Sequence, residues 1–376
     1  MLRCNILTVF LAFSLLAGAQ DWKVVRENPQ KAFPKTVAAG NYSGIAHLHD
    51  DIYAVVSDKS DSALYFNFRI LVNPKTGELE QVENLGFTER TDGTLNDGKP
   101  WLGQEKGFDH EAIVKVSDST LVIASEGYCR LKEYPILHTS ADAAKVDYPQ
   151  NLWESRWSSS DFYPNYNFES LAFDSIRQYL WTIPESTLRK DGQPASPQNG
   201  LANQLRLIRY DWGKMREESS KENSSKKDSL YMTTYAYQMD QPSTHKKADI
   251  YVMGVSELCA LPDGQLLVLE REAFIPKIKI GAFSKCKLYL INPLNSEEFS
   301  MKDKFSSDTP FLKKRLLTEW KTGLSLSKRS FANYEGMCLG PKLEDGSQVI
   351  ILLSDSQDQY AGVLKDWFKT IVIRKE

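Results

Sequence analysis

Three observations predict an all-β chain folded as a single β-propeller. A short motif recurs five times along the 376 residues, each copy reads as a β-hairpin, and long helical periodicity is absent. Aromatic residues make up 11% of the chain, and turn-forming dipeptides are scattered through it. A propeller blade takes roughly 40–50 residues. The length therefore suits about six blades, within a range of about five to seven.

The repeated motif has a constant plan. An acid or a serine is followed by small and apolar residues, then by a polar turn, and then by an apolar run that ends at an acid. The copies begin at Ser43–Ala46, Glu111–Val114, Glu169–Ala172, Glu257–Ala260 and Glu335–Cys338, and their closing acids are Asp58, Glu126, Glu185, Glu270 and Asp355.

The second copy shows why we interpret the motif as a hairpin. Residues 111–117 alternate loosely between apolar and polar, Ser117–Ser119 favours a turn, and Leu121–Ala124 is typical of a buried strand. Glu111 opens the first strand and Glu126 closes the second. The two ends of an antiparallel pair lie side by side. The acids of each copy should therefore meet at the end of the hairpin opposite the turn.

Other segments are assigned in chain order. The first and last predicted strands could pair to close the propeller, and two polar segments are predicted as insertions. The first strand is predicted at Trp22–Val25 and the last at 370–374. A Gly-, Asp- and Thr-rich loop at 88–109, which carries Trp101 and Lys106, could cover the acids. A solvated loop is predicted at 213–229, between strands 205–211 and 230–238.

Residues 1–19 have the features of a secretory signal peptide. Arg3 precedes an apolar run, and Ala17–Ala19 offers a cleavage site of small residues. We expect residues 20–376 to form one domain, exported to the periplasm or the extracellular space. No later stretch is apolar enough to span a bilayer. The formal net charge of −3 argues against nucleic acid as a partner, and we expect a monomer.

Four cysteines follow the signal peptide. Cys259 and Cys338 stand inside the motif, where other copies have apolar residues, which favours core thiols over disulfides. An exported chain could still pair two of them, and Cys259 with Cys286 is the first pair to test. Cys129 is the fourth. The spacing matches no zinc motif.

The acids are the candidate functional residues. If the first strand of each hairpin lines the propeller channel, the acids gather at one mouth of it. Two like charges ~4 Å apart repel by about 4 kcal/mol at an effective dielectric near 20, so protons, cations or basic side chains must neutralise them. Oxygen ligands favour Ca²⁺, with Mg²⁺ second. The candidate metal ligands are Asp58, Glu111, Glu126, Glu169, Glu185, Glu257, Glu270, Glu335 and Asp355.

Basic residues recur soon after the closing acids. Lys59, Arg130, Arg189 and Arg271 could pair with the acids and lock the blades, or they could bind a small anionic substrate. A metal beside cations suits a phosphoester, because the metal activates water while the cations hold the phosphate. The candidate catalytic residues are Glu111, Glu169, Glu335 and His110, the last as a general base or ligand.

The copies resemble the phytase-like family, described as having the esterase-like activity of phytase. That family shows segments of the type Ser-Gly-Ile-Ala or Glu-Gly-Ile-Ala, followed by apolar runs that end in Ser-Asp or Ser-Glu. Its pattern appears here at Ser43–Ala46 with Ser57–Asp58, Glu111–Val114 with Ser125–Glu126, and Glu335–Cys338 with Ser354–Asp355. The departures are Ala112, Ser170 and Leu258 in place of Gly, and Pro184 in place of Ser.

The resemblance runs from about residue 40 to 360 and implies a secreted β-propeller grouped with phosphoester hydrolases. It carries over no catalytic set. Three functions therefore stay open: a Ca²⁺-dependent phosphoester hydrolase, a non-catalytic propeller that binds a ligand or a protein around a structural metal, and a Ca²⁺-dependent esterase or lactonase.

Overall fold

A computed structural model describes residues 21–58, 64–87, 109–136, 152–219, 231–325, 329–357 and 364–376. The predicted signal peptide, Lys59, Trp101 and Lys106 lie outside these ranges, as does all but the last residue of the predicted loop at 88–109. Within the described ranges, no helix is both long and apolar enough to cross a membrane.

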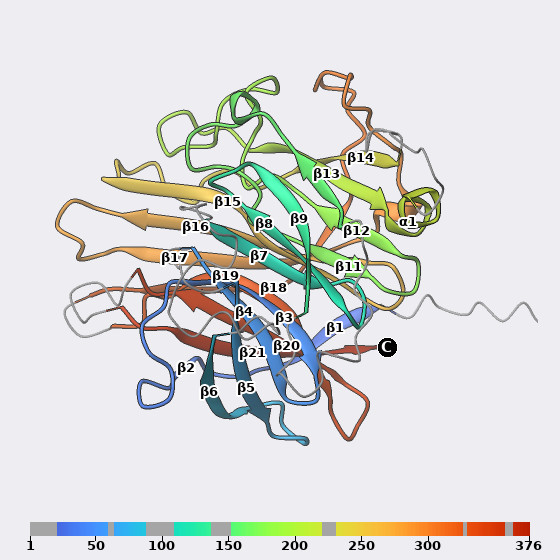
Figure 1. Cartoon of the computed structure of the whole chain (residues 1–376). Helices are drawn as coiled ribbons and strands as arrows, with labels where there is room; N and C mark the ends of the chain where they lie inside the picture. The colour runs from blue at the N-terminus through green and yellow to red at the C-terminus, as the bar shows by residue number, and fades with distance from the viewer. Residues whose placement is uncertain are drawn as a thin grey trace, which may run out of the picture.

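The described residues form five antiparallel sheets, each built on four main strands (Figure 1). In four of the sheets these strands follow one another in the chain, and the fifth sheet joins strands from both ends of the chain. The first two sheets are β3 (Tyr42–His49), β4 (Ile52–Ser57), β5 (Phe66–Val72) and β6 (Leu79–Phe87), and β7 (His110–Lys115), β8 (Thr120–Ser125), β9 (Arg130–Pro135) and β10 (Glu154–Arg156). The next two are β11 (Ala172–Asp174), β12 (Tyr179–Thr182), β13 (Gln204–Asp211) and β14 (Met232–Gln238), and β15 (Ile250–Ala260), β16 (Leu266–Ile275), β17 (Phe283–Ile291) and β18 (Lys314–Gly323).

The fifth sheet joins the two ends of the chain, and we call it the closing sheet. It comprises β19 (Asn333–Lys342), β20 (Gln348–Asp355), β21 (Trp367–Lys375) and β1 (Trp22–Glu27), with the short β2 (Lys31–Ala32) also on β21. β1 pairs with β21 from Trp22 opposite Lys375 to Glu27 opposite Ile371. This pairing confirms the prediction that the first and last strands meet.

The first strands of the five sheets lie against one another in a closed cycle. β3 contacts β7, β7 contacts β11, β11 contacts β15, β15 contacts β19, and β19 contacts β3. Their approach is close: a Cβ added to Gly44 would lie 2.8 Å from the Glu111 carbonyl oxygen, and one added to Gly336 would lie 2.8 Å from that of Ser43. Sheets that radiate from a closed ring of first strands define the β-propeller.

The core lies between neighbouring sheets. One apolar cluster joins the β11–β14 and β15–β18 sheets through residues such as Trp181 and Val268, and another joins the β3–β6 sheet to the closing sheet through Val55 and Ile351. Inner strands are covered on both faces, so they are continuous apolar runs rather than alternating ones. In β20 every residue is buried.

The structure confirms the all-β propeller, but it does not confirm the blade count. We expected about six blades, within a range of about five to seven, and the described residues contribute five sheets. The four cysteines are buried and free, which confirms the core-thiol reading over a Cys259–Cys286 disulfide.

One prediction of a loop was wrong. Residues 213–229 were expected to form a solvated loop. The part at 220–229 lies outside the described residues, but Trp212–Ser219 form the helix α1. The reason is that Trp212 and Met215 share one face and are buried in the core between the β7–β10 and β11–β14 sheets. Helical spacing brings residues three apart onto one side, and the charged residues around these two concealed the pattern.

Candidate functional site

Each hairpin carries a β-bulge at the end opposite its turn. In the β7–β8 pair, His110 faces Ser125 and Ala112 faces Ala124, which leaves Glu111 as the extra residue. The β19–β20 pair has the same shift around Glu335. Bulges re-aim a side chain at a strand end and are common beside active sites. Here the leading acids of the motif, such as Glu111 and Glu335, are themselves the extra residues of the bulges.

The strand register aligns the five copies at three positions. The extra residue on the first strand of each hairpin occupies the bulge position. The residue two positions before it occupies the flanking position. The residue of the second strand that lies opposite the flanking residue occupies the closing position. In chain order the flanking residues are Asn41, Asp109, Asn167, Gly254 and Asn333, the bulge residues are Ser43, Glu111, Glu169, Ser256 and Glu335, and the closing residues are Asp58, Glu126, Glu185, Arg271 and Asp355.

The alignment corrects the fourth copy by one residue. Val255 faces Glu270 and Gly254 faces Arg271, and the register shifts before Glu257. The bulge residue is therefore Ser256 and the closing residue is Arg271. Glu257 and Glu270, which we had aligned with the acids of the other copies, each occupy the neighbouring position.

Arg271 is surrounded by oxygen atoms from two neighbouring sheets. Its Nη2 donates to Glu185 Oε1 at 2.5 Å and to Glu169 Oε2 at 3.3 Å, and its Nη1 donates to Glu335 Oε1 and, at 3.2 Å, to Asn333 Oδ1. The Arg271 side chain is 3% exposed and that of Glu185 is 0% exposed. We call these five residues the arginine half of the ring.

The opposite side of the ring carries four acids and is here called the acidic half: Asp58, Asp109, Glu111 and Glu126. One carboxylate oxygen from each of Asp58, Asp109 and Glu111 lies within 4.8 Å of the others. Glu126 Oε1 is buried and accepts no hydrogen bond from the described residues. Convergent carboxylates at this spacing can act as ligands to a divalent cation.

Burial, together with repulsion between neighbouring carboxylates, raises the pKa values of the five glutamates of the ring: Glu111, Glu126, Glu169, Glu185 and Glu335. For Glu111, burial acts first and the charges of Glu169 and Glu335 follow. Burial, then Glu169, raises the pKa of Glu126 to about 8. Burial also raises the pKa of Glu185 to about 7, although Arg271 opposes it. The ring therefore holds protons at neutral pH unless a cation replaces them.

Glu257 is a structural hydrogen-bond acceptor that links two neighbouring blades. Its Oε1 accepts from the backbone amides of Leu171 at 2.9 Å and Leu258 at 3.0 Å, which lie in two different sheets. Glu270 is held away from the ring by Lys314 at 2.6 Å and by the Tyr237 hydroxyl at 2.7 Å. The structure thus brings neither residue to the acidic half.

The predicted basic residues are dispersed. Arg130 is 1% exposed and lies 3.7 Å from Glu154. Arg189 is exposed, donates to the Phe162 carbonyl and stacks on Tyr163. Arg271 alone of the described three is in the ring. His110 is buried, and burial together with Arg130 lowers its pKa to about 3, so its imidazole is neutral at physiological pH.

Asp109 was missed by the sequence reasoning. A signal for it exists, because Asn or Asp stands two residues before the bulge residue in four copies: Asn41, Asp109, Asn167 and Asn333. Asn41 and Asp109 have φ values of 47° and 51°, in the left-handed region that Asn and Asp tolerate better than other side chains.

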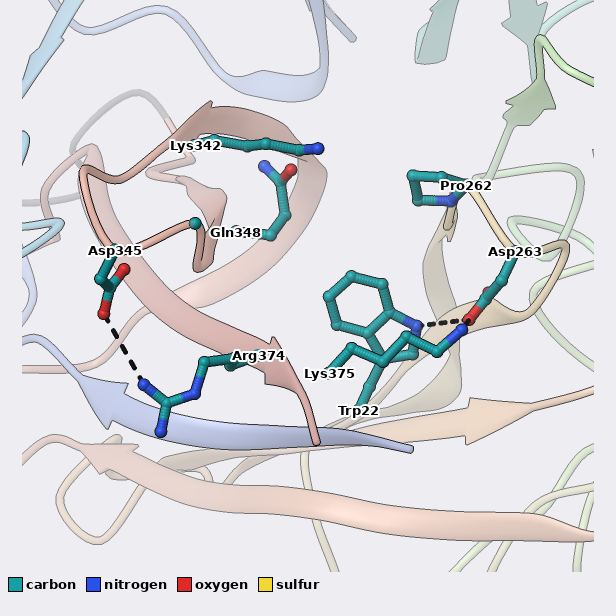
Figure 2. A pocket seen from close by; sticks show the side chains of 9 residues that line it. Trp22, Pro262, Asp263, Lys342, Asp345, Gln348, Arg374 and Lys375 are labelled. Carbon is teal, nitrogen blue, oxygen red and sulfur yellow. Dashed lines mark hydrogen bonds and ion pairs between the residues drawn. The ribbon is translucent and has the colours of Figure 1, made fainter. Parts of the chain in front are cut away.

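A cavity of about 450 Å³ lies at the opposite end of the sheets, between the turns of the β15–β16 and β19–β20 hairpins (Figure 2). Two pairs of charged groups lie in its lining: Asp263 accepts from Lys375 Nζ, and also from Trp22 Nε1, both at 2.8 Å, and Arg374 lies 3.7 Å from Asp345. It is separate from the acidic ring, which lies at the other end of the hairpins.

Comparison with known families decides the family. The profile of the phytase-like family, described as "esterase-like activity of phytase", matches residues 37–357. The chain belongs to the phytase-like family. The match spans every copy of the motif that the ring uses. Among curated proteins, no sequence matches this phytase-like chain.

Solved structures with a similar trace are distant from this phytase-like protein. An exo-1,5-alpha-L-arabinanase from a bovine ruminal metagenomic library is 10% identical with a TM-score of 0.38, covering 92% of this chain and 95% of its own. A streptogramin B lyase is 9% identical with a TM-score of 0.33, covering 93% and 98%. The Dos1 propeller is 10% identical with a TM-score of 0.28, covering 88% and 68%.

Proposed function

We propose that this phytase-like protein binds one divalent cation in the acidic half of the ring and hydrolyses a phosphoester there. The carrying observation is the convergence of Asp58, Asp109 and Glu111 from two sheets within 4.8 Å. All three offer hard oxygen ligands, which suit Ca²⁺ first and Mg²⁺ second. The donor set fits the ion chemically, because burial and the charges of neighbouring carboxyls, Asp109 and Asp58 among them, raise the pKa of Glu111, and a cation would favour its ionised form.

The residues around the ion define what it would do. When bound, a divalent ion polarises a phosphoryl oxygen and lowers the pKa of bound water. Ionised carboxylates beside the ion would repel an anionic substrate, so a bound cation would also serve to anchor that substrate. Without metal, the pKa of Glu126 is about 8, so this carboxyl is mostly protonated at neutral pH; a bound cation would lower that pKa and leave a carboxylate able to accept a proton from water.

The roles of the other predicted catalytic residues divide by position. Glu111 is a ligand in this proposal. Glu169 and Glu335 are held by Arg271 and orient it. His110 is neutral and buried, so we assign it to packing beside Arg130 rather than to proton transfer.

One observation favours a second candidate. The family description names an esterase-like activity, and a cation at the acidic half could polarise a carboxylester carbonyl as well as a phosphoryl group. A binding propeller with a purely structural ion is the third candidate. Residues 1–19 favour export to the periplasm or the extracellular space in every case, and we expect the protein to act as a monomer on a small anionic substrate.

Purified protein assayed on p-nitrophenyl phosphate, bis-p-nitrophenyl phosphate and p-nitrophenyl acetate tests the proposal. Each assay is run with Ca²⁺ and with chelator, on the wild type, on Asp109→Asn and on the control Glu80→Gln, whose exposed side chain bonds Asn73. We expect phosphoester turnover that chelator and Asp109→Asn remove and Glu80→Gln preserves. Turnover of the acetate alone selects the esterase, and no turnover anywhere selects the binding propeller.

A further inference from the structure

The closing position of the ring is an acid in four sheets and an arginine in one. Asp58, Glu126, Glu185 and Asp355 occupy it in four sheets, and Arg271 occupies it in the β15–β18 sheet. The guanidinium extends from its own sheet to carboxylates of both neighbouring sheets, Glu169 and Glu185 on one side and Glu335 on the other.

We propose that Arg271 is an internal cation that occupies a second metal site of the ring. Removing its charge would open a site for another divalent ion between Glu169, Glu185, Glu335 and Asn333. We call this the latent site. A total of two bound ions would require the proposed ion at Asp58, Asp109 and Glu111, but the latent site itself is tested by how many more ions the Arg271 variant binds than wild type.

The ligand set around the guanidinium is the first argument. Three carboxylates and the Asn333 amide oxygen point at one cation, and two of the carboxylates bond the same nitrogen, Nη2. Carboxylate and amide oxygens are the ligands that Ca²⁺ uses in proteins. Replacing the guanidinium therefore leaves a site of matching chemistry.

An unsatisfied oxygen is the second argument. Glu185 is 0% exposed, and its Oε2 accepts no hydrogen bond from the described residues although its Oε1 is bound to Arg271. A buried carboxylate oxygen without a donor is costly. One guanidinium, with a single positive charge, leaves this group of three carboxylates under-neutralised, and a divalent ion would match it better.

The consequence for chemistry is a one-metal ring. Two-metal sites clamp both the attacking and the leaving oxygen of a phosphoryl group. Here one of the two cation positions is filled by a side chain that cannot be lost to a chelator. Arg271 thus limits the protein to one exchangeable ion and makes half of the ring independent of metal supply.

The test counts ions. Wild type, Arg271→Met and Arg271→Lys are stripped with chelator, dialysed and titrated with CaCl₂ by isothermal calorimetry. We expect Arg271→Met to bind one ion more than wild type and Arg271→Lys, which keeps the charge, to bind the same number. Adding Glu185→Gln to Arg271→Met should remove the extra ion or weaken it at least about tenfold. An unchanged count in Arg271→Met overturns the inference.

The two proposals fail separately. A wild type that binds no Ca²⁺ contradicts the proposed function. The site at Arg271 is then still tested by whether Arg271→Met binds one ion more than wild type. If Arg271→Met does not fold in chelator, it is refolded in millimolar CaCl₂. Recovery of a cooperative melt supports the latent site, because the ion replaces the guanidinium. Failure to fold with Ca²⁺, while Arg271→Lys folds, overturns it.

Discussion

Arg271 Nη2 donates a hydrogen bond to Glu185 Oε1 at 2.5 Å, and both side chains are almost completely shielded from solvent. The bond joins the β15–β18 sheet to the β11–β14 sheet at the mouth of the channel. It sets the half of the ring that contains Arg271 apart from the half in which the carboxylates of Asp58, Asp109 and Glu111 converge. The remaining expectations depend on this division.

Metal removal should lower the stability of the folded protein. An ion that binds only the native state stabilises it by about 2.7 kcal/mol when its concentration is a hundred times Kd. For a chain of this size, we expect chelator to lower Tm on the order of 5 °C and added Ca²⁺ to restore it. Differential scanning calorimetry measures both, and an unchanged Tm would count against any bound ion.

The metal-free protein should lose stability as pH rises. The pKa values of Glu126 and Glu185 are about 8 and about 7 in the fold, above the usual 4.5. Between pH 4.5 and these raised pKa values, the folded state therefore holds more protons than the unfolded state. The stability that these two groups contribute is complete below pH 4.5 and is lost as pH rises through about 7 to 8. Each group contributes a slope of about 1.4 kcal/mol per pH unit.

Urea unfolding in chelator at pH 5.5, 6.5 and 7.5 measures this decline. Saturating Ca²⁺ should flatten it, because the ion favours the same ionised carboxylates that the empty fold disfavours. A free energy of unfolding that rises with pH in chelator would show that other groups dominate.

Glu257 should matter for stability through its hydrogen bonds. Glu257→Ala removes the acceptor of two backbone amides, those of Leu171 and Leu258. Leaving such donors unsatisfied should cost about 2–4 kcal/mol. Glu257→Gln keeps a carbonyl oxygen there and should cost about 1 kcal/mol or less. Urea denaturation compares the two, and equal losses would contradict the acceptor role.

The ring of first strands should not tolerate a methyl group at its closest contacts. In Gly336→Ala the new Cβ would meet the Ser43 carbonyl oxygen at 2.8 Å, so β3 and β19 must separate. We expect a loss of about 1–3 kcal/mol. Gly213→Ala in α1 is the control, since its new Cβ would lie 3.3 Å from Gln178 Cβ, a longer contact than the 2.8 Å at Gly336. Comparable losses in both variants would exclude a special packing at the ring.

The sequence could predict the hairpins and the end at which their acids meet, because turn residues and closing acids repeat with a constant plan. It could not predict that the fourth copy is offset by one residue, because Glu257 and Glu270 stand next to the true bulge and closing positions and fit the sequence pattern of the motif. Only the pairing of Val255 with Glu270 reveals that Arg271 takes the closing position.

Burial explains the other difference. Trp212 and Met215 form one face of α1, but the charged residues around them dominate the composition of that segment. Asp109 was overlooked because the motif was taken to begin at Glu111. The backbone hydrogen bond from Glu126 to the Asp109 carbonyl, at 2.8 Å, places it beside the closing acid.

The most direct test of the account is calorimetric titration of chelator-stripped protein with CaCl₂, comparing wild type, Asp109→Asn and Glu80→Gln. We predict that wild type and Glu80→Gln bind one ion with the same affinity and that Asp109→Asn binds it at least about tenfold more weakly, since one carboxylate ligand of three is lost. Absence of binding in wild type, or equal affinity in all three, would contradict the proposed metal site.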